Sequence, residues 1–193
     1  NPKLKEYIKS ADLILCLGAR LGENTTGGYS LLNVPNPDIS LIHIHPDPNE
    51  LGRVYTPDIS LACNSSDFLA RALACAVKKR SDLTSLKKDY YSWREPFETP
   101  GLVKMEQIIL QLNDVLAEET IVTNGAGNYA AWLHRYFQYK SFKTQLAPTS
   151  GSMGYGIPAA ISAKLEHPST EVVCLAGDGC AQMSIQEFGT AMQ

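Results

Sequence analysis

The sequence predicts an α/β fold built on parallel sheets, and two observations support this prediction. Short apolar runs rich in Val, Ile and Leu recur along the chain, and such runs are typical of strands buried on both faces of a parallel sheet. These runs alternate with segments of helical period, which is the pattern of βα units. The predicted strands are residues 12–17, 41–45, 58–62, 121–123, 145–147 and 172–176.

The predicted helices follow from capping residues and from apolar residues at three- and four-residue spacing. The clearest case is the segment 105–116, where the apolar side chains recur at Met105, Ile109 and Leu112. Asp67 is expected to cap a helix that runs to about residue 76, and residues 184–187 have the pattern of a capping box. The other predicted helical segments are 4–8, a short turn at 49–52, 130–137 and 152–165.

Composition narrows the range of functions. The 193 residues carry a formal net charge of −3 and show no basic stripe, so we expect neither a nucleic-acid partner nor a membrane partner. The five cysteines are scattered, without a Cys-x-x-Cys pair. Buried, reduced thiols in a cytoplasmic protein are the simplest interpretation of that pattern.

The loop after the first predicted strand carries a candidate ligand contact. Residues 18–22 form a Gly-bounded turn but do not match the Gly-x-Gly-x-x-Gly fingerprint of dinucleotide-binding folds. Arg20 in this turn is equally compatible with a ligand phosphate contact and with a local salt bridge. His43 and His45 share one strand face, but without a third ligand nearby in sequence they indicate hydrogen-bonded histidines rather than a metal site.

Two glycine-rich turns in the second half of the chain carry the chemistry. Asp178 lies between two glycines directly after the apolar run 172–176, at the carboxyl end of a predicted parallel strand, where ligands bind in such sheets. A hard carboxylate at this position suits Mg²⁺ that bridges to a phosphate. The second turn, 125–127, leads from a strand into a helix and could present backbone amides to an anion, although an ordinary βα turn has the same pattern.

Three segments in this order resemble the thiamine diphosphate enzymes, in particular the acetolactate synthase-like carboligases and decarboxylases that act on 2-oxoacids. They are the Gly-Ser-Met-Gly segment 151–154, the Gly-Ile-Pro-Ala-Ala segment 156–160 and the Gly-Asp-Gly turn 177–179. The resemblance covers nearly the whole chain. It implies a transferase or lyase that needs thiamine diphosphate and Mg²⁺, with a 2-oxoacid such as pyruvate as substrate.

The resemblance also implies roles for individual residues. Asp178 matches the metal ligand, and Met153 matches the bulky side chain that supports the bent cofactor. No catalytic residue is expected here, because the activating Glu of the family lies on an N-terminal domain. The expected cofactor-binding residues are Gly127, Asn128, Tyr129, Gly151, Ser152, Met153, Gly177, Asp178, Gly179, Cys180 and Ala181.

By the same resemblance, residues 1–77 are the end of a Rossmann-like middle domain, 78–103 a linker and 104–193 the first part of the thiamine diphosphate-binding domain. We expect the chain to be a fragment, inactive by itself, from a homodimer or homotetramer with active sites between subunits. FAD at the middle domain stays open as an alternative. His45, where FAD-binding relatives commonly have Asp, argues against it.

Two alternative functions remain. One is another thiamine diphosphate enzyme, such as a benzoylformate- or oxalyl-type decarboxylase, a sulfoacetaldehyde acetyltransferase or a hydrolase of a cyclic dione. The other is a module that binds FAD or NAD without thiamine chemistry. The missing dinucleotide fingerprint and the intact turn around Asp178 argue against the second alternative.

Overall fold

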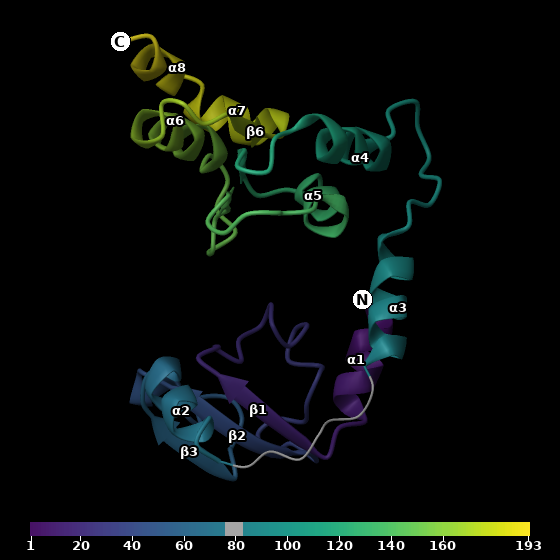
Figure 1. Cartoon of the computed structure of the whole chain (residues 1–193), viewed down its shortest axis with the longest axis vertical. Helices are drawn as coiled ribbons and strands as arrows, with labels where there is room; N and C mark the ends of the chain where they lie inside the picture. The colour runs from purple at the N-terminus through teal and green to yellow at the C-terminus, as the bar shows by residue number, and fades with distance from the viewer. Residues whose placement is uncertain (76–82) are drawn as a thin grey trace. The chain divides into compact units, whose positions relative to one another are not determined.

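The computed structural model describes residues 1–75 and 83–193, which divide into unit 1, Asn1–Trp93, and unit 2, Arg94–Gln193 (Figure 1). Each unit contains a three-stranded parallel sheet. The predicted fold class is therefore confirmed. The predicted domain boundaries at 77 and 103 remain predictions, and the first of them lies outside the described residues.

The sheet of unit 1 has the order β1-β2-β3, with β1 at Leu13–Leu17, β2 at Ser40–His45 and β3 at Ile59–Ala62. All neighbours are parallel, and Cys16 pairs in register with His43. The core of the unit consists of Cys16, Leu32, Leu41 and Tyr55. The central strand β2 is the most buried of the three because it has a neighbour on each side.

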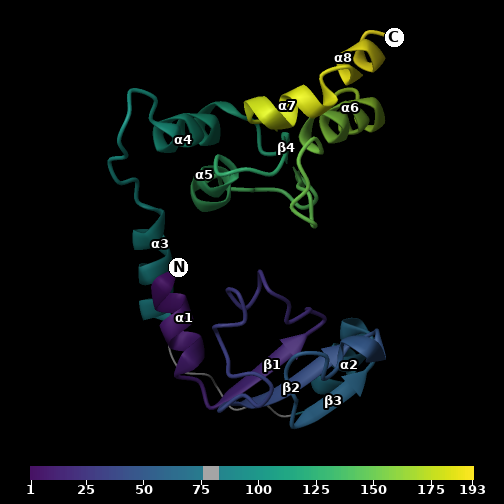
Figure 2. The ribbon, with the colours of Figure 1, turned by 180° about the vertical axis from the view of Figure 1, so that it is seen from behind.

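The helices of unit 1 are α1 at Pro2–Lys9, the 3-10 helix η1 at Pro48–Glu50, α2 at Ser65–Ala72 and α3 at Thr84–Arg94. The predicted cap at Asp67 is wrong, because α2 begins at Ser65 after an extended Asn64 and Asp67 lies inside the first turn. The helix α3 occupies much of the expected linker. It lies beside α1, to which Lys3 and Asp89 connect it by an ion pair of 2.5 Å (Figures 1 and 2).

The sheet of unit 2 has the order β5-β4-β6, with β5 at Gln145–Leu146, β4 at Ile121–Asn124 and β6 at Val172–Leu175. Every residue of β4 is buried, as expected for a strand covered on both faces. Successive side chains of a strand point to opposite faces. Accordingly, Val122 packs in the core with Ile109 and Leu133, whereas the hydroxyl of Thr123 donates to the Gly156 carbonyl at 2.9 Å.

The helices of unit 2 are α4 at Met105–Val115, α5 at Ala130–Tyr136, α6 at Gly156–Glu166, α7 at Asp178–Ser184 and α8 at Glu187–Ala191. The helix predicted from Ser152 starts only at Gly156, since Gly151 and Gly154 have φ values of 68° and 81°, outside the helical region. The predicted capping box is also wrong, because Ser184 ends α7 instead of opening a helix.

Among residues 1–75 and 83–193, none of the helices has the length and apolar character needed to cross a membrane. All five cysteines are free thiols; Cys16 and Cys180 are buried as expected, whereas Cys75 is exposed.

Glu106, in the first turn of α4, should make unit 2 sensitive to acid. Its side chain is 3% exposed and accepts hydrogen bonds from the Thr99 hydroxyl at 2.9 and 2.8 Å. A hydrogen bond from its own backbone amide, opposed by burial and assisted by Thr99, holds the pKa of Glu106 below its ordinary value of 4.5. The stabilisation from the carboxylate is therefore complete above pH 4.5 and is lost as the pH falls through the lower folded-state pKa.

We expect the urea midpoint of the wild-type protein to fall below pH 4.5 more steeply than that of Glu106→Gln, which has no carboxylate to protonate. Thr99→Val, which removes only one donor, should show an intermediate slope. Chemical denaturation between pH 7 and pH 3 measures these slopes. Equal slopes for all three proteins would contradict the assignment.

Candidate cofactor-binding site

Three loops of unit 2 meet at the carboxyl ends of β4 and β6. The two strand ends are level, because Asn124 pairs in register with Leu175. The first loop, 125–129, leads from β4 to α5, and the second, 176–177, leads from β6 directly into α7. The third loop, 151–155, precedes α6, which packs against both strands. This is the edge at which parallel sheets bind ligands.

The Tyr129 side chain joins the first loop to the second. A Cβ added to Gly177 would lie 2.9 Å from the Tyr129 ring, and one added to Gly127 would lie 2.8 Å from it. The ring therefore needs glycine at both positions. A second link is the Cys180 thiol, which donates to the Ala126 carbonyl at 2.8 Å. Side chains that the sequence places far apart thus hold the two glycine-rich turns together.

The Tyr129 hydroxyl is buried beside Gly125 and Cys180. It has no hydrogen-bond partner among the described residues, and the hydrogen of the adjacent Cys180 thiol is already given to Ala126. Burial, followed by the nearby Cys180 thiol, raises the pKa of Tyr129 to about 12. The phenol therefore stays protonated at neutral pH.

Met153 in the third loop lies against the first turn of α7. A Cβ added to Gly179 would be 3.0 Å from the Met153 methyl group, and one added to Gly154 would be 3.2 Å from Met183. Met153 nevertheless leaves 44% of its surface exposed. A large apolar side chain that packs against the protein on one side and is partly exposed on the other can contact the flat surface of a ligand.

Asp178 is the first residue of α7, and its side chain is exposed. No hydrogen bond or ion pair engages its carboxylate among the described residues. In the same part of the chain, no cluster of three or more His, Cys, Asp and Glu side chains surrounds a metal position. Mg²⁺ is often held by one or two carboxylates plus phosphate oxygens and waters, so a single free carboxylate fits this metal when a phosphate is also bound.

The backbone amides at the start of α7 complete the candidate site. The first turn of a helix leaves its amides without a helical partner, and no side chain caps α7. The amide of Ala181 is already engaged, since it donates to the Gly177 carbonyl at 2.8 Å. The amides of Asp178, Gly179 and Cys180 therefore have no carbonyl acceptor within the helix.

The structure brings most, but not all, of the predicted site residues together. Tyr129 contacts both Gly127 and Gly177, and Met153 contacts Gly179. By contrast, Asn128, Gly151 and Ser152 are exposed, and no atom outside its own turn lies within 4 Å of a Cβ added to Gly151. Sequence reasoning missed Asn124, which is 1% exposed and has a side-chain oxygen without a partner. The signal that could have identified Asn124 from sequence is its position at the end of a buried strand.

Gly156 permits the closest approach of backbones in the site. A Cβ added there would lie 2.8 Å from the Gly125 amide nitrogen and 3.0 Å from the Asn124 carbonyl carbon. Both are backbone atoms and cannot rotate away. We expect Gly156→Ala to lower the free energy of unfolding by about 1–3 kcal/mol.

The matched control for this substitution is Gly189→Ala in α8, where no atom lies within 4 Å of an added Cβ. It should be neutral or slightly stabilising, because alanine is the better helix former. Urea unfolding at neutral pH compares the two variants. Equal stability of Gly156→Ala and the wild-type protein would contradict the close packing of α6 on β4.

The fold and the loops are those of an α/β protein with a candidate site for a phosphate-bearing cofactor. Comparison with known families gives two matches: the model of the thiamine pyrophosphate enzyme central domain matches residues 1–72, and that of the C-terminal TPP binding domain matches residues 125–193. The chain belongs to the thiamine pyrophosphate enzyme family. The resemblance seen in the sequence is confirmed.

The curated relatives that the chain resembles are acetolactate synthases. The large subunit of the enzyme from Pyropia yezoensis is 28% identical over 96% of this chain, and that from Haemophilus influenzae is 29% identical over 95%. The isozyme 2 large subunit from Escherichia coli is also 29% identical, over 95% of the chain. These alignments cover 32–33% of each relative, so the chain spans about a third of the length of the curated relatives it matches.

Proposed function

We propose that this chain contributes the diphosphate-binding site of a thiamine diphosphate- and Mg²⁺-dependent enzyme that acts on a 2-oxoacid, as an acetolactate synthase-like carboligase or decarboxylase. The observation that supports this most strongly is the free carboxylate of Asp178, which lies at the carboxyl end of β6 beside the loop that carries Tyr129. The printed names of the relatives point to the same chemistry.

In this proposal each group has one task. Asp178 binds Mg²⁺ together with the diphosphate oxygens, and the amides of Gly179 and Cys180 donate to the diphosphate. The Tyr129 ring holds the two glycine-rich turns together. Met153 supports the bend of the cofactor, and the Gly151 carbonyl and the Met153 amide contact its aminopyrimidine. Gly127, Asn128, Ser152, Gly177 and Ala181 line these loops.

When bound, thiamine diphosphate supplies the carbanion chemistry needed for a 2-oxoacid, and the protein supplies position and charge. We nominate no catalytic acid or base on this chain, and we assign activation of the cofactor to a Glu elsewhere in the enzyme. We also propose a homodimer or homotetramer that works in the cytoplasm.

Calorimetric titration of thiamine diphosphate into the full-length protein, with and without Mg²⁺, tests the proposal. We expect micromolar binding that disappears when Mg²⁺ is removed. A screen of 2-oxoacids then identifies the reaction, since acetolactate from pyruvate indicates a carboligase and an aldehyde indicates a decarboxylase. Absence of binding to a protein shown to be folded would contradict the proposal.

A further inference from the structure

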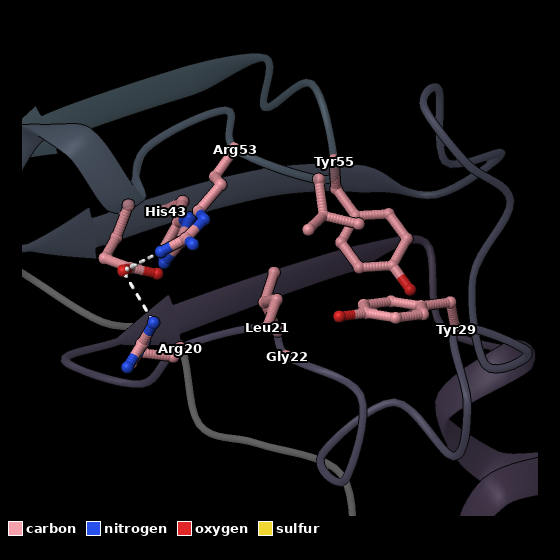
Figure 3. A pocket seen from close by; sticks show the side chains of 9 residues that line it. Arg20, Leu21, Gly22, Tyr29, His43, Arg53 and Tyr55 are labelled. Atoms are coloured by element: carbon pink, nitrogen blue, oxygen red, sulfur yellow. Dashed lines mark hydrogen bonds and ion pairs between the residues drawn. The ribbon is translucent and has the colours of Figure 1, made fainter.

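Unit 1 contains a pocket of about 140 Å³ that no step of the proposed function uses. It lies beside the carboxyl ends of β1 and β2, between the turn that follows β1 and the segment that includes η1. Its polar lining residues are Arg20, Tyr29, His43, Glu50, Arg53 and Tyr55 (Figure 3).

One wall of the pocket carries an excess of positive charge. Glu50 accepts a hydrogen bond from Arg20 Nη2 at 2.9 Å and another from Arg53 Nη1 at 2.8 Å (Figure 3). Although burial opposes ionisation, these two hydrogen bonds hold the pKa of Glu50 below its usual range, so the carboxylate is charged. Two guanidinium groups therefore share one carboxylate, and most of their ten N–H donors remain available to a second anion.

The pocket also contains a buried donor without a partner. Tyr55 is 2% exposed, and its hydroxyl has no hydrogen-bond partner among the described residues. His43 is not available in the same way, because its Nε2 lies 3.0 Å from the Ala19 carbonyl oxygen. The Tyr55 hydroxyl is directed toward Tyr29 and away from the guanidinium groups (Figure 3), so the arginines are the polar groups that a ligand would meet.

The pocket by itself is too small to enclose a flavin dinucleotide. A cavity of about 150 Å³ accommodates benzene, whereas pockets for drug-sized ligands and cofactors measure about 300–1,000 Å³. Arg20, which the sequence left open as a phosphate contact, is used by Glu50 in a local salt bridge.

We propose that this pocket binds a small carboxylate anion with a short apolar body, of about six non-hydrogen atoms. A guanidinium group matches the two oxygens of a carboxylate. The apolar side chains of Leu21 and Val54, which also line the pocket, favour a carbon body over inorganic phosphate.

Calorimetric titration of propionate into the full-length protein without thiamine diphosphate tests this proposal. Propionate is not a 2-oxoacid, so its binding is independent of the proposed reaction. We expect a dissociation constant in the millimolar range, at least about tenfold weaker binding in Arg53→Gln, and unchanged binding in Tyr55→Phe. The control Arg71→Gln, on the exposed surface of α2, should bind propionate like the wild-type protein.

Parallel titrations with inorganic phosphate, ADP and FAD distinguish the competing ligands. Tighter binding of phosphate than of propionate would overturn the assignment of a carboxylate, and micromolar binding of ADP or FAD would overturn the argument from size. Absence of propionate binding, or equal binding by wild type and Arg53→Gln, would also refute the proposal. Circular dichroism establishes that each variant is folded. None of these outcomes depends on whether Asp178 binds Mg²⁺.

Discussion

Asp178→Ala should weaken the binding of thiamine diphosphate in the presence of Mg²⁺ by at least about 100-fold. Loss of a partner that only orients a metal ligand typically costs 10–100-fold, and Asp178 is proposed to be a ligand itself. Its carboxylate has no other partner among the described residues, so the substitution removes no structural contact. Stability in the absence of cofactor should therefore change little.

The matched control is Asp114→Ala, the same substitution at an exposed position of α4 that the site does not use. Calorimetric titration over a range of Mg²⁺ concentrations separates loss of the metal from loss of the diphosphate contacts. In Asp178→Ala, the residual affinity should no longer depend on Mg²⁺. An unchanged affinity would refute the assignment of Asp178 as the metal ligand.

Met153→Ala should reduce turnover of a 2-oxoacid about 10–100-fold while the affinity for thiamine diphosphate stays within about threefold. The phosphate contacts that hold the cofactor come from other residues, so truncation of Met153 leaves most of the binding energy in place. The missing side chain removes the support beneath the bend, and misplacement by about 1 Å can cost a factor of about 100 in rate. Steady-state kinetics and calorimetry together measure this difference.

Met153→Leu, which keeps an apolar side chain of similar size, should retain most of the activity. Met192→Ala tests the same truncation at a position that is 87% exposed, and we expect no effect there. If Met153→Ala reduced affinity and turnover by the same factor, Met153 would be a simple packing residue for the first turn of α7.

Several elements could be predicted from sequence because their signals are local. The apolar runs of β1, β2, β4 and β6 lie where the structure has strands. The turn around Asp178 falls at the end of a strand. This was predictable because an apolar run is typical of a buried strand and the two glycines around Asp178 favour a turn. The start of α7 at Asp178 was missed, because glycine at 179 has low helix propensity and only its contact with Met153 explains its presence.

Other features depend on partners that are distant in sequence. Both interpretations of Arg20 were open until the structure placed Glu50 at 2.9 Å from its guanidinium group. The hydrogen bond from Cys180 to Ala126 joins residues 54 positions apart, and no local pattern marks either of them. The beginning of α6 was predicted four residues too early. A run of small residues is compatible with a helix, and only the φ values of the glycines show that the helix has not yet begun.

The sequence by itself determined the parallel α/β architecture and the position of Asp178 at a strand end, because each depends on residues within one strand or turn. It also determined the family, through three segments in the expected order. Only the tertiary structure decided that Tyr129 closes over Gly127 and Gly177, that Met153 rests on Gly179 and that unit 1 has a small pocket lined by Arg20 and Arg53. The physical reason is that contacts between side chains depend on how separate elements pack. A pattern of neighbours along the chain specifies each element but not the partner against which it packs.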